Sequence, residues 1–231
     1  MPVCRHCHLE GVGRYCTDCG EIYEPKRITV HSIIHEAVHT FTHADKGILH
    51  TLKCLVLHPG TMQKEYIGGE RKIHQKPFAL FFICATITAI ALHFVNKTPE
   101  NYIDFDVAKE HFYKNYYVIQ QTVMLPAYAL ITWGVFYSKN FNYAEALVLM
   151  IYSLSFSLLI IIPINLLGYI FKGINEQLVE IIFLAVYMTI TNVNFFKEKN
   201  HFIIVAKSVV VMLACYGLSY LAGRQVIQAL V

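Results

Sequence analysis

Charged side chains are scarce in this chain. Among its 231 residues, 15% are Asp, Glu, Lys or Arg, whereas 55% are hydrophobic. A soluble domain carries about 25% charged residues, so this composition argues against an ordinary cytosolic enzyme. The formal net charge of +3 is too small to suggest nucleic-acid binding, and we expect no nucleic-acid partner.

The familiar catalytic signatures are also missing. The sequence contains no GxSxG turn, no Walker phosphate loop and no HExxH motif, and it shows no internal repeat. We therefore predict no catalytic residues. A membrane metal-dependent hydrolase remains a lesser alternative, with a metal centre assembled from His39, His43, Asp45, His50 and His58.

Long apolar runs are absent before Pro77 and frequent after it. The run from Ile48 to Leu57 has ten residues, which suits an interfacial or re-entrant helix but is too short to span a bilayer. Later runs are long enough to cross a hydrocarbon core of about 30 Å. We predict five spans, at 77–95, 117–137, 144–171, 178–196 and 202–222. Pro163 leaves open a division of the third span into two short helices.

The orientation is predicted from the basic residues in the loops. With a cytosolic amino terminus, that side holds thirteen Lys and Arg residues and the opposite side holds five. Because positive loops stay in the cytosol, we expect the amino terminus inside and the carboxyl terminus outside. We expect no secretory signal peptide.

Four of the seven cysteines lie in the first nineteen residues as two CxxC pairs, Cys4 with Cys7 and Cys16 with Cys19. Four thiolates at this spacing can surround one tetrahedral ion, and a closed sulfur set favours structural zinc over iron. Two disulfides are the alternative in an oxidising compartment. We predict a small zinc ribbon over residues 1–24, which needs its metal to fold and presents a surface to a protein partner.

A histidine stripe follows the ribbon. Its members recur every fourth residue, so they lie along one side of an amphipathic helix predicted between about residues 28 and 45. Three interpretations remain open: a second metal site, a pH sensor, or a plain solvated face. The candidate residues for metal binding or pH sensing are His31, His35, His39, His43 and His50.

A compact basic segment precedes the first span. Gly69 allows a close approach of backbone N–H groups to an anion, and Arg71 and Lys72 can bind lipid phosphate. The alternative is that these positive charges act only as a topology determinant.

Ionisable residues within the spans are few. Glu145, Lys207, Glu180 and Arg224 are expected near span ends, either in ion pairs between helices or snorkelling to the surface. The amides Gln120, Gln121, Asn165, Asn192 and Asn194 are expected to form hydrogen bonds between helices, with a polar cleft as the alternative.

The order of these features resembles a bacterial family of unknown function that combines an amino-terminal zinc ribbon with a multi-span membrane domain. The resemblance rests on the ribbon followed by Asp45-Lys46-Gly47, Thr51, His58-Pro59-Gly60, Tyr66-Ile67-x-Gly69-x-Arg71 and Pro77. It implies a bacterial inner-membrane protein and no established activity. In topology alone, the chain is also similar to Yip-type five-helix membrane domains, which are associated with trafficking and membrane organisation.

We therefore predict an all-α polytopic membrane protein with about five transmembrane helices and a small zinc ribbon. Its parts are the ribbon at 1–24, a cytosolic His-rich and juxtamembrane segment at 25–76, and the membrane domain at 77–231. The leading hypothesis is a non-enzymatic protein whose ribbon docks a partner and whose helices bind lipid or a membrane partner. The alternative is a transporter or channel for a small solute or metal ion, with a His-lined sensing site.

Overall fold

The computed structural model describes residues 1–25, 27–33, 47–95, 105–137, 141–171, 175–197 and 200–230. Within residues 47–230 of this described part, the short helices α2 (Ile48–Leu57) and α3 (Thr61–Gly68) precede the long ones. The long helices are α4 (Pro77–Val95), α5 (Phe105–Val135), α6 (Tyr143–Ile170), α7 (Glu176–Phe196) and α8 (His201–Leu230). All five are long and apolar enough to cross a membrane, which confirms the predicted all-α polytopic fold class.

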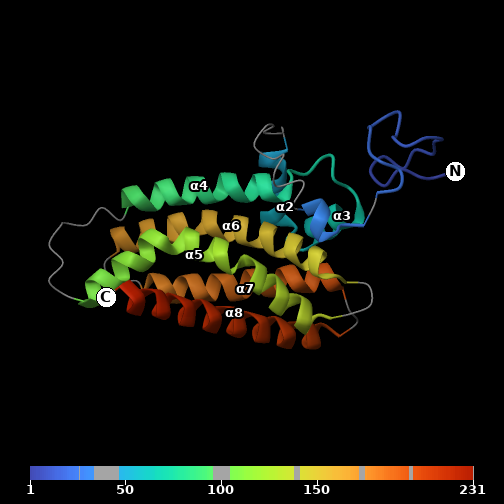
Figure 1. The fold of residues 1–231 in the computed structure, drawn as a ribbon. Helices are drawn as coiled ribbons and strands as arrows, with labels where there is room; N and C mark the ends of the chain where they lie inside the picture. Colours follow the sequence, from blue (N-terminus) through green and yellow to red (C-terminus); the bar gives the residue numbers. More distant parts are fainter. Residues whose placement is uncertain are drawn as a thin grey trace.

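The five long helices run side by side, and successive helices point in opposite directions (Figure 1). The amino-terminal ribbon, α2 and α3 gather at one end of this bundle, and the carboxyl terminus lies at the other (Figure 1). We refer to the first as the ribbon end. Because the chain runs along the bundle an odd number of times, from α4 to α8, its two termini lie at opposite ends of the bundle.

Helix α6 is the centre of the packing. Its apolar residues point in every direction around the axis, as expected for a helix surrounded by other helices. From Ala144 to Leu158 every residue is buried. The buried hydroxyls of Ser153, Ser155 and Ser157 each donate to the carbonyl four residues earlier, so they need no partner on another helix.

Helix α6 continues as one helix past Pro163. The division of the third span into two segments is therefore not observed. Its first turn is fixed by a capping box, in which Asn142 and Glu145 exchange side-chain and backbone hydrogen bonds of 2.8 and 2.9 Å.

Helices α2 and α3 cap the ribbon end of the bundle. The turn between them contains Gly60, whose φ of +84° favours glycine. The Asn194 amide of α7 donates to the Pro59 carbonyl at 2.8 Å, and the Tyr152 hydroxyl of α6 donates to the Gln75 carbonyl at 2.5 Å. These bonds fix the juxtamembrane segment to two different spans.

Candidate metal centre and its junction with the membrane helices

The four ribbon cysteines form one compact cluster. Their sulfur atoms all lie within 4.8 Å of one another, with Cys4 to Cys19 at 3.5 Å and Cys7 to Cys16 at 3.4 Å. In the part of the chain that the structure describes, they are the single group of three or more Cys, His, Asp or Glu residues this close together. The structure thus brings together the four cysteines that the sequence predicts as metal ligands.

Each cysteine pair sits on the same kind of turn. Backbone N–H groups of His8 and Gly20 donate to the carbonyls of Cys4 and Cys16, at 3.0 and 2.9 Å. His8 and Gly20 both have positive φ, 60° and 71°, directly after the second cysteine of each pair. Two turns of the same kind thus present their sulfurs to the same space.

This arrangement fits a metal ion better than free thiols. A tetrahedral zinc ion with sulfur at about 2.3 Å holds its ligands about 3.8 Å apart, close to the separations of 3.5 and 3.4 Å in the two shortest pairs. Hydrogen bonds from backbone N–H groups lower the pKa of Cys16 to about 6, and the bond from Cys19 has the largest effect. One thiolate is thus available at neutral pH to bind a metal ion. When bound, zinc would cross-link the two turns and leave no open position for chemistry.

The ribbon is fastened to the end of α3 and to the segment that leads on to α4. The Arg5 guanidinium donates to the Gly68 carbonyl, and the Lys72 backbone N–H donates to the Glu21 carboxylate at 3.0 Å. Gly69, with φ +116°, lets Pro25 approach so closely that a side chain at this position would collide with the proline ring. The ribbon is thereby held against α3 and the segment that follows it.

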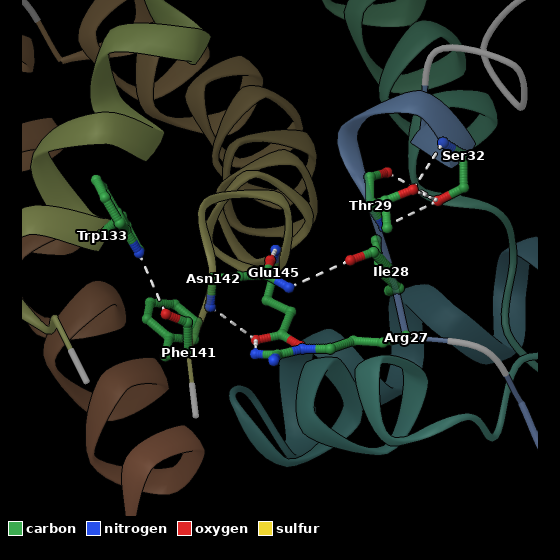
Figure 2. A network of polar contacts seen from close by, with 8 residues as sticks. All are labelled: Arg27, Ile28, Thr29, Ser32, Trp133, Phe141, Asn142 and Glu145. Carbon is green, nitrogen blue, oxygen red and sulfur yellow. Dashed lines mark hydrogen bonds and ion pairs between the residues drawn. The ribbon is translucent and has the colours of Figure 1, made fainter. Parts of the chain in front are cut away.

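A second fastening joins the chain after the ribbon to α6. The Arg27 guanidinium donates from Nε and Nη2 to the two oxygens of the Glu145 carboxylate, at 2.8 and 3.1 Å (Figure 2). The Asn142 amide donates to the Ile28 carbonyl at 3.2 Å beside it. Of the two roles expected for Glu145, pairing between helices or snorkelling, it pairs, but with a residue that precedes all the spans.

A cleft of about 480 Å³ opens between the ribbon and α3. Its basic residues come from three separate segments: Arg5 and His8 from the ribbon, Lys64 from α3, and Lys197 from the end of α7. The carboxylates of Glu65 and Glu70 also line it. The cleft thus offers several cations, together with two anions, at one end of the membrane helices.

The residues expected to bind lipid phosphate lie next to this cleft. Gly69 is buried against Pro25, and the Lys72 backbone is bonded to the ribbon. The Arg71 guanidinium lies over the Tyr66 ring, 5.8 Å from its centroid, and donates to the Tyr66 carbonyl at 3.3 Å. Contact of Gly69, Arg71 and Lys72 with lipid stays a prediction, because their described contacts are within the protein.

The histidine stripe is only partly placed. His31 is exposed near the start of a short helical turn at residues 30–33, and His50 is exposed on α2. His35, His39 and His43 lie outside the described residues, and so does Asp45. The stripe's role in metal binding or pH sensing, and the hydrolase alternative, therefore stay untested.

Sequence reasoning missed a buried histidine. His74 is 4% exposed, and neither of its ring nitrogens has a hydrogen-bond partner among the described residues. Burial, with added positive charge at His50 and His6, lowers the pKa of His74 to about 4, so its ring is neutral at physiological pH. No periodic pattern marks His74, because it lies in an irregular segment between α3 and α4.

Several polar groups pair inside the bundle. The Gln120 amide of α5 donates to the Ser219 carbonyl of α8 at 2.7 Å, and the Asn192 amide of α7 donates to the Ser208 hydroxyl of α8 at 3.0 Å. These two amides confirm the expected bonds between helices, whereas Asn165 bonds within its own helix. The Tyr117 hydroxyl of α5 also donates to the Glu180 carboxylate of α7, at 2.5 Å.

Comparison with known proteins adds one relationship. A family model described as a protein of unknown function, DUF3667, matches residues 45–89, a segment that comprises α2, α3 and the first part of α4. No curated protein and no solved structure matches the chain. The chain is therefore similar, over this segment, to a family without an assigned activity. Its likeness to Yip-type domains stays a prediction.

Proposed function

We propose that this chain is a non-enzymatic, multi-pass protein of the bacterial inner membrane that binds an anionic lipid headgroup at its ribbon end and docks a protein partner on its zinc ribbon. The amino terminus is cytosolic in this proposal and the carboxyl terminus lies outside, as the distribution of Lys and Arg supports.

The cleft between the ribbon and α3 carries the lipid part of the proposal. Arg5, Lys64 and Lys197 converge there from segments far apart in sequence, at the level where α7 ends. Basic side chains at a membrane interface attract anionic headgroups, and an arginine can hold a phosphate through two parallel hydrogen bonds. The expected ligand is therefore a phosphate-bearing headgroup.

A thermal-shift measurement in mild detergent tests this proposal. Short-chain phosphatidylglycerol should raise the apparent unfolding temperature of the wild-type protein more than short-chain phosphatidylcholine does. The double variant Lys64→Glu/Lys197→Glu should lose that difference. Lys76→Glu is the matched control, because Lys76 is an exposed juxtamembrane cation outside the cleft lining. An equal loss in the control would indicate general surface charge and contradict a specific site.

The ribbon surface supports the docking part. Leu9, Val12 and Tyr15 are 43, 82 and 54% exposed on a module that the Arg5 and Glu21 contacts hold in place. Exposed apolar side chains on a rigid support are typical of a protein interface. A photo-crosslinking side chain at Val12 should give one discrete adduct in cells, whereas the same probe at exposed Val56 of α2 should not.

Transport of a small solute is the second candidate. The polar contacts of Tyr117 with Glu180 and of Gln120 with Ser219 place hydrogen-bonding groups between α5, α7 and α8. Such groups within spans often mark a substrate path. Flux in proteoliposomes that is abolished by Glu180→Gln would favour this function over the first.

A further inference from the structure

We propose that His50, Cys54, Glu65 and His74 bind a second divalent transition-metal ion, of the zinc class, between α2, α3 and the segment before α4. This site is separate from the four ribbon cysteines. All four residues fall within the segment 45–89 that the DUF3667 family model matches.

The two α2 residues form one half of the site. His50 and Cys54 are four residues apart, so they lie on the same face of the helix. The His50 Nε2 atom lies 3.5 Å from the Cys54 Sγ atom. A tetrahedral ion that binds nitrogen at about 2.0–2.1 Å and sulfur at about 2.3 Å holds these two atoms about 3.5 Å apart.

His74 and Glu65 form the other half. The His74 Nε2 atom lies 3.8 Å from a Glu65 carboxylate oxygen, which is too far for a hydrogen bond. Nitrogen and oxygen ligands of one tetrahedral ion lie about 3.4 Å apart, so a shift of a few tenths of an ångström is enough to join them through a metal. The buried, neutral His74 ring, without a hydrogen-bond partner among the described residues, is the kind of donor that a metal requires.

The two halves face each other. The rings of His50 and His74 have centroids 5.6 Å apart. Two imidazoles on one tetrahedral ion have centroids about 5 Å apart, given the metal–nitrogen distance. The four ligand atoms are less tightly gathered than the ribbon sulfurs. The exposed His50 ring and the 43% exposed Glu65 side chain can turn to complete the site.

The donor set selects the class of ion. Two imidazoles, one thiolate and one carboxylate match the borderline preference of Zn²⁺ and Co²⁺, whereas Mg²⁺ and Ca²⁺ prefer oxygen ligands alone. The Cys54 thiol releases its proton when the metal binds.

Metal stoichiometry of the full-length protein in mild detergent tests the proposal. After incubation with Zn²⁺ and desalting, elemental analysis should give two zinc ions per chain for the wild type and one for His50→Ala, Cys54→Ser and His74→Phe. His58→Ala is the matched control, since His58 is an exposed histidine just after α2 that is not one of the four proposed ligands, and it should retain two. Neither His50 nor Cys54 lines the lipid cleft, so these variants leave the proposed headgroup site intact.

Cobalt spectroscopy gives a second measurement, useful if His74→Phe fails to fold. Titration of the metal-free protein with Co²⁺ should produce sulfur-to-cobalt charge-transfer bands with two binding steps, and Cys54→Ser should remove one of them. A single zinc ion per chain in the wild type would overturn the proposal. Two zinc ions that persist in both His50→Ala and Cys54→Ser would also overturn it, because the second ion would then be bound elsewhere.

Discussion

The Arg27 guanidinium and the Glu145 carboxylate, 118 residues apart in sequence, are joined by two parallel hydrogen bonds at the start of α6 (Figure 2). The Glu145 side chain is 7% exposed and the Arg27 side chain 54%. The carboxylate is therefore a buried charge whose cation comes from the chain that leads out of the ribbon. This pair couples the position of the amino-terminal module to the central helix of the bundle.

We expect Arg27→Ala to destabilise this junction by about 1–3 kcal/mol, since it leaves a buried charged acceptor without its cation. Arg27→Lys should recover only part of the loss. The ammonium restores the positive charge, but it cannot donate two parallel bonds in a fixed plane. Apparent unfolding temperature in detergent, together with the rate of proteolysis of the amino-terminal module, measures the effect.

A double-mutant cycle separates this pair from unrelated effects. Arg27→Ala combined with Glu145→Gln should cost less than the sum of the two single changes. Arg224→Ala, an exposed cation at the other end of the bundle, is the control and should have little effect. Additive losses in the cycle would show that the two residues are not energetically coupled.

The ribbon should depend on its metal, whereas the membrane helices should not. Cys16→Ser removes one of four sulfur ligands, and structural zinc supplies about 10–16 kcal/mol of apparent binding free energy to modules of this size. We expect loss of the ribbon zinc and rapid proteolysis of residues 1–24, with the helical circular dichroism signal retained. Cys84→Ser, a buried cysteine in α4, should leave the zinc content unchanged. Unchanged zinc in Cys16→Ser would contradict the assignment of these ligands.

The spans and the cysteine cluster were predictable because both are local in sequence. A helix that crosses a membrane needs an uninterrupted apolar run, and the two CxxC pairs place four sulfurs within nineteen residues. The ribbon's zinc itself stays a prediction, because only the proximity of the four sulfurs is observed.

The contacts that assemble these parts were not predictable from one sequence. Glu145 pairs with Arg27 and Tyr152 with Gln75 across 118 and 77 residues, and hydrophobic periodicity contains no information on which partner a polar group finds. The same holds for His74, whose burial depends on how α2, α3 and the ribbon meet. Pro163 was also misleading as a possible break, because packing around α6 outweighs the local cost of one proline.

Gly60 should be among the least replaceable residues in the matched segment. Its φ of +84° is unfavourable for any other residue, and a Cβ atom there would collide with the Thr191 carbonyl of α7. We expect Gly60→Ala to cost more than about 1 kcal/mol and to lower the yield of folded protein. Gly217→Ala in α8 is the matched control, because no described atom outside its own helix turn lies within 4 Å of the place its methyl group would take, so the change should be neutral or stabilising. If Gly60→Ala and Gly217→Ala change the unfolding temperature equally, the close approach of Gly60 to Thr191 of α7 is refuted.

Substitutions of Tyr117 and Glu180 can distinguish a structural polar contact between α5 and α7 from a transport site. Hydrogen bonds between membrane helices contribute about 0.6 kcal/mol on average. If the pair only joins α5 to α7, Tyr117→Phe and Glu180→Gln should each lower the apparent unfolding temperature slightly, with no change in solute or metal-ion flux across proteoliposomes. Phe183→Leu, a change of apolar packing on the same helix, serves as the control for general loosening. A flux that Glu180→Gln abolishes while Phe183→Leu preserves it would overturn the structural assignment, because the carboxylate would then act on the transported species rather than on Tyr117 alone.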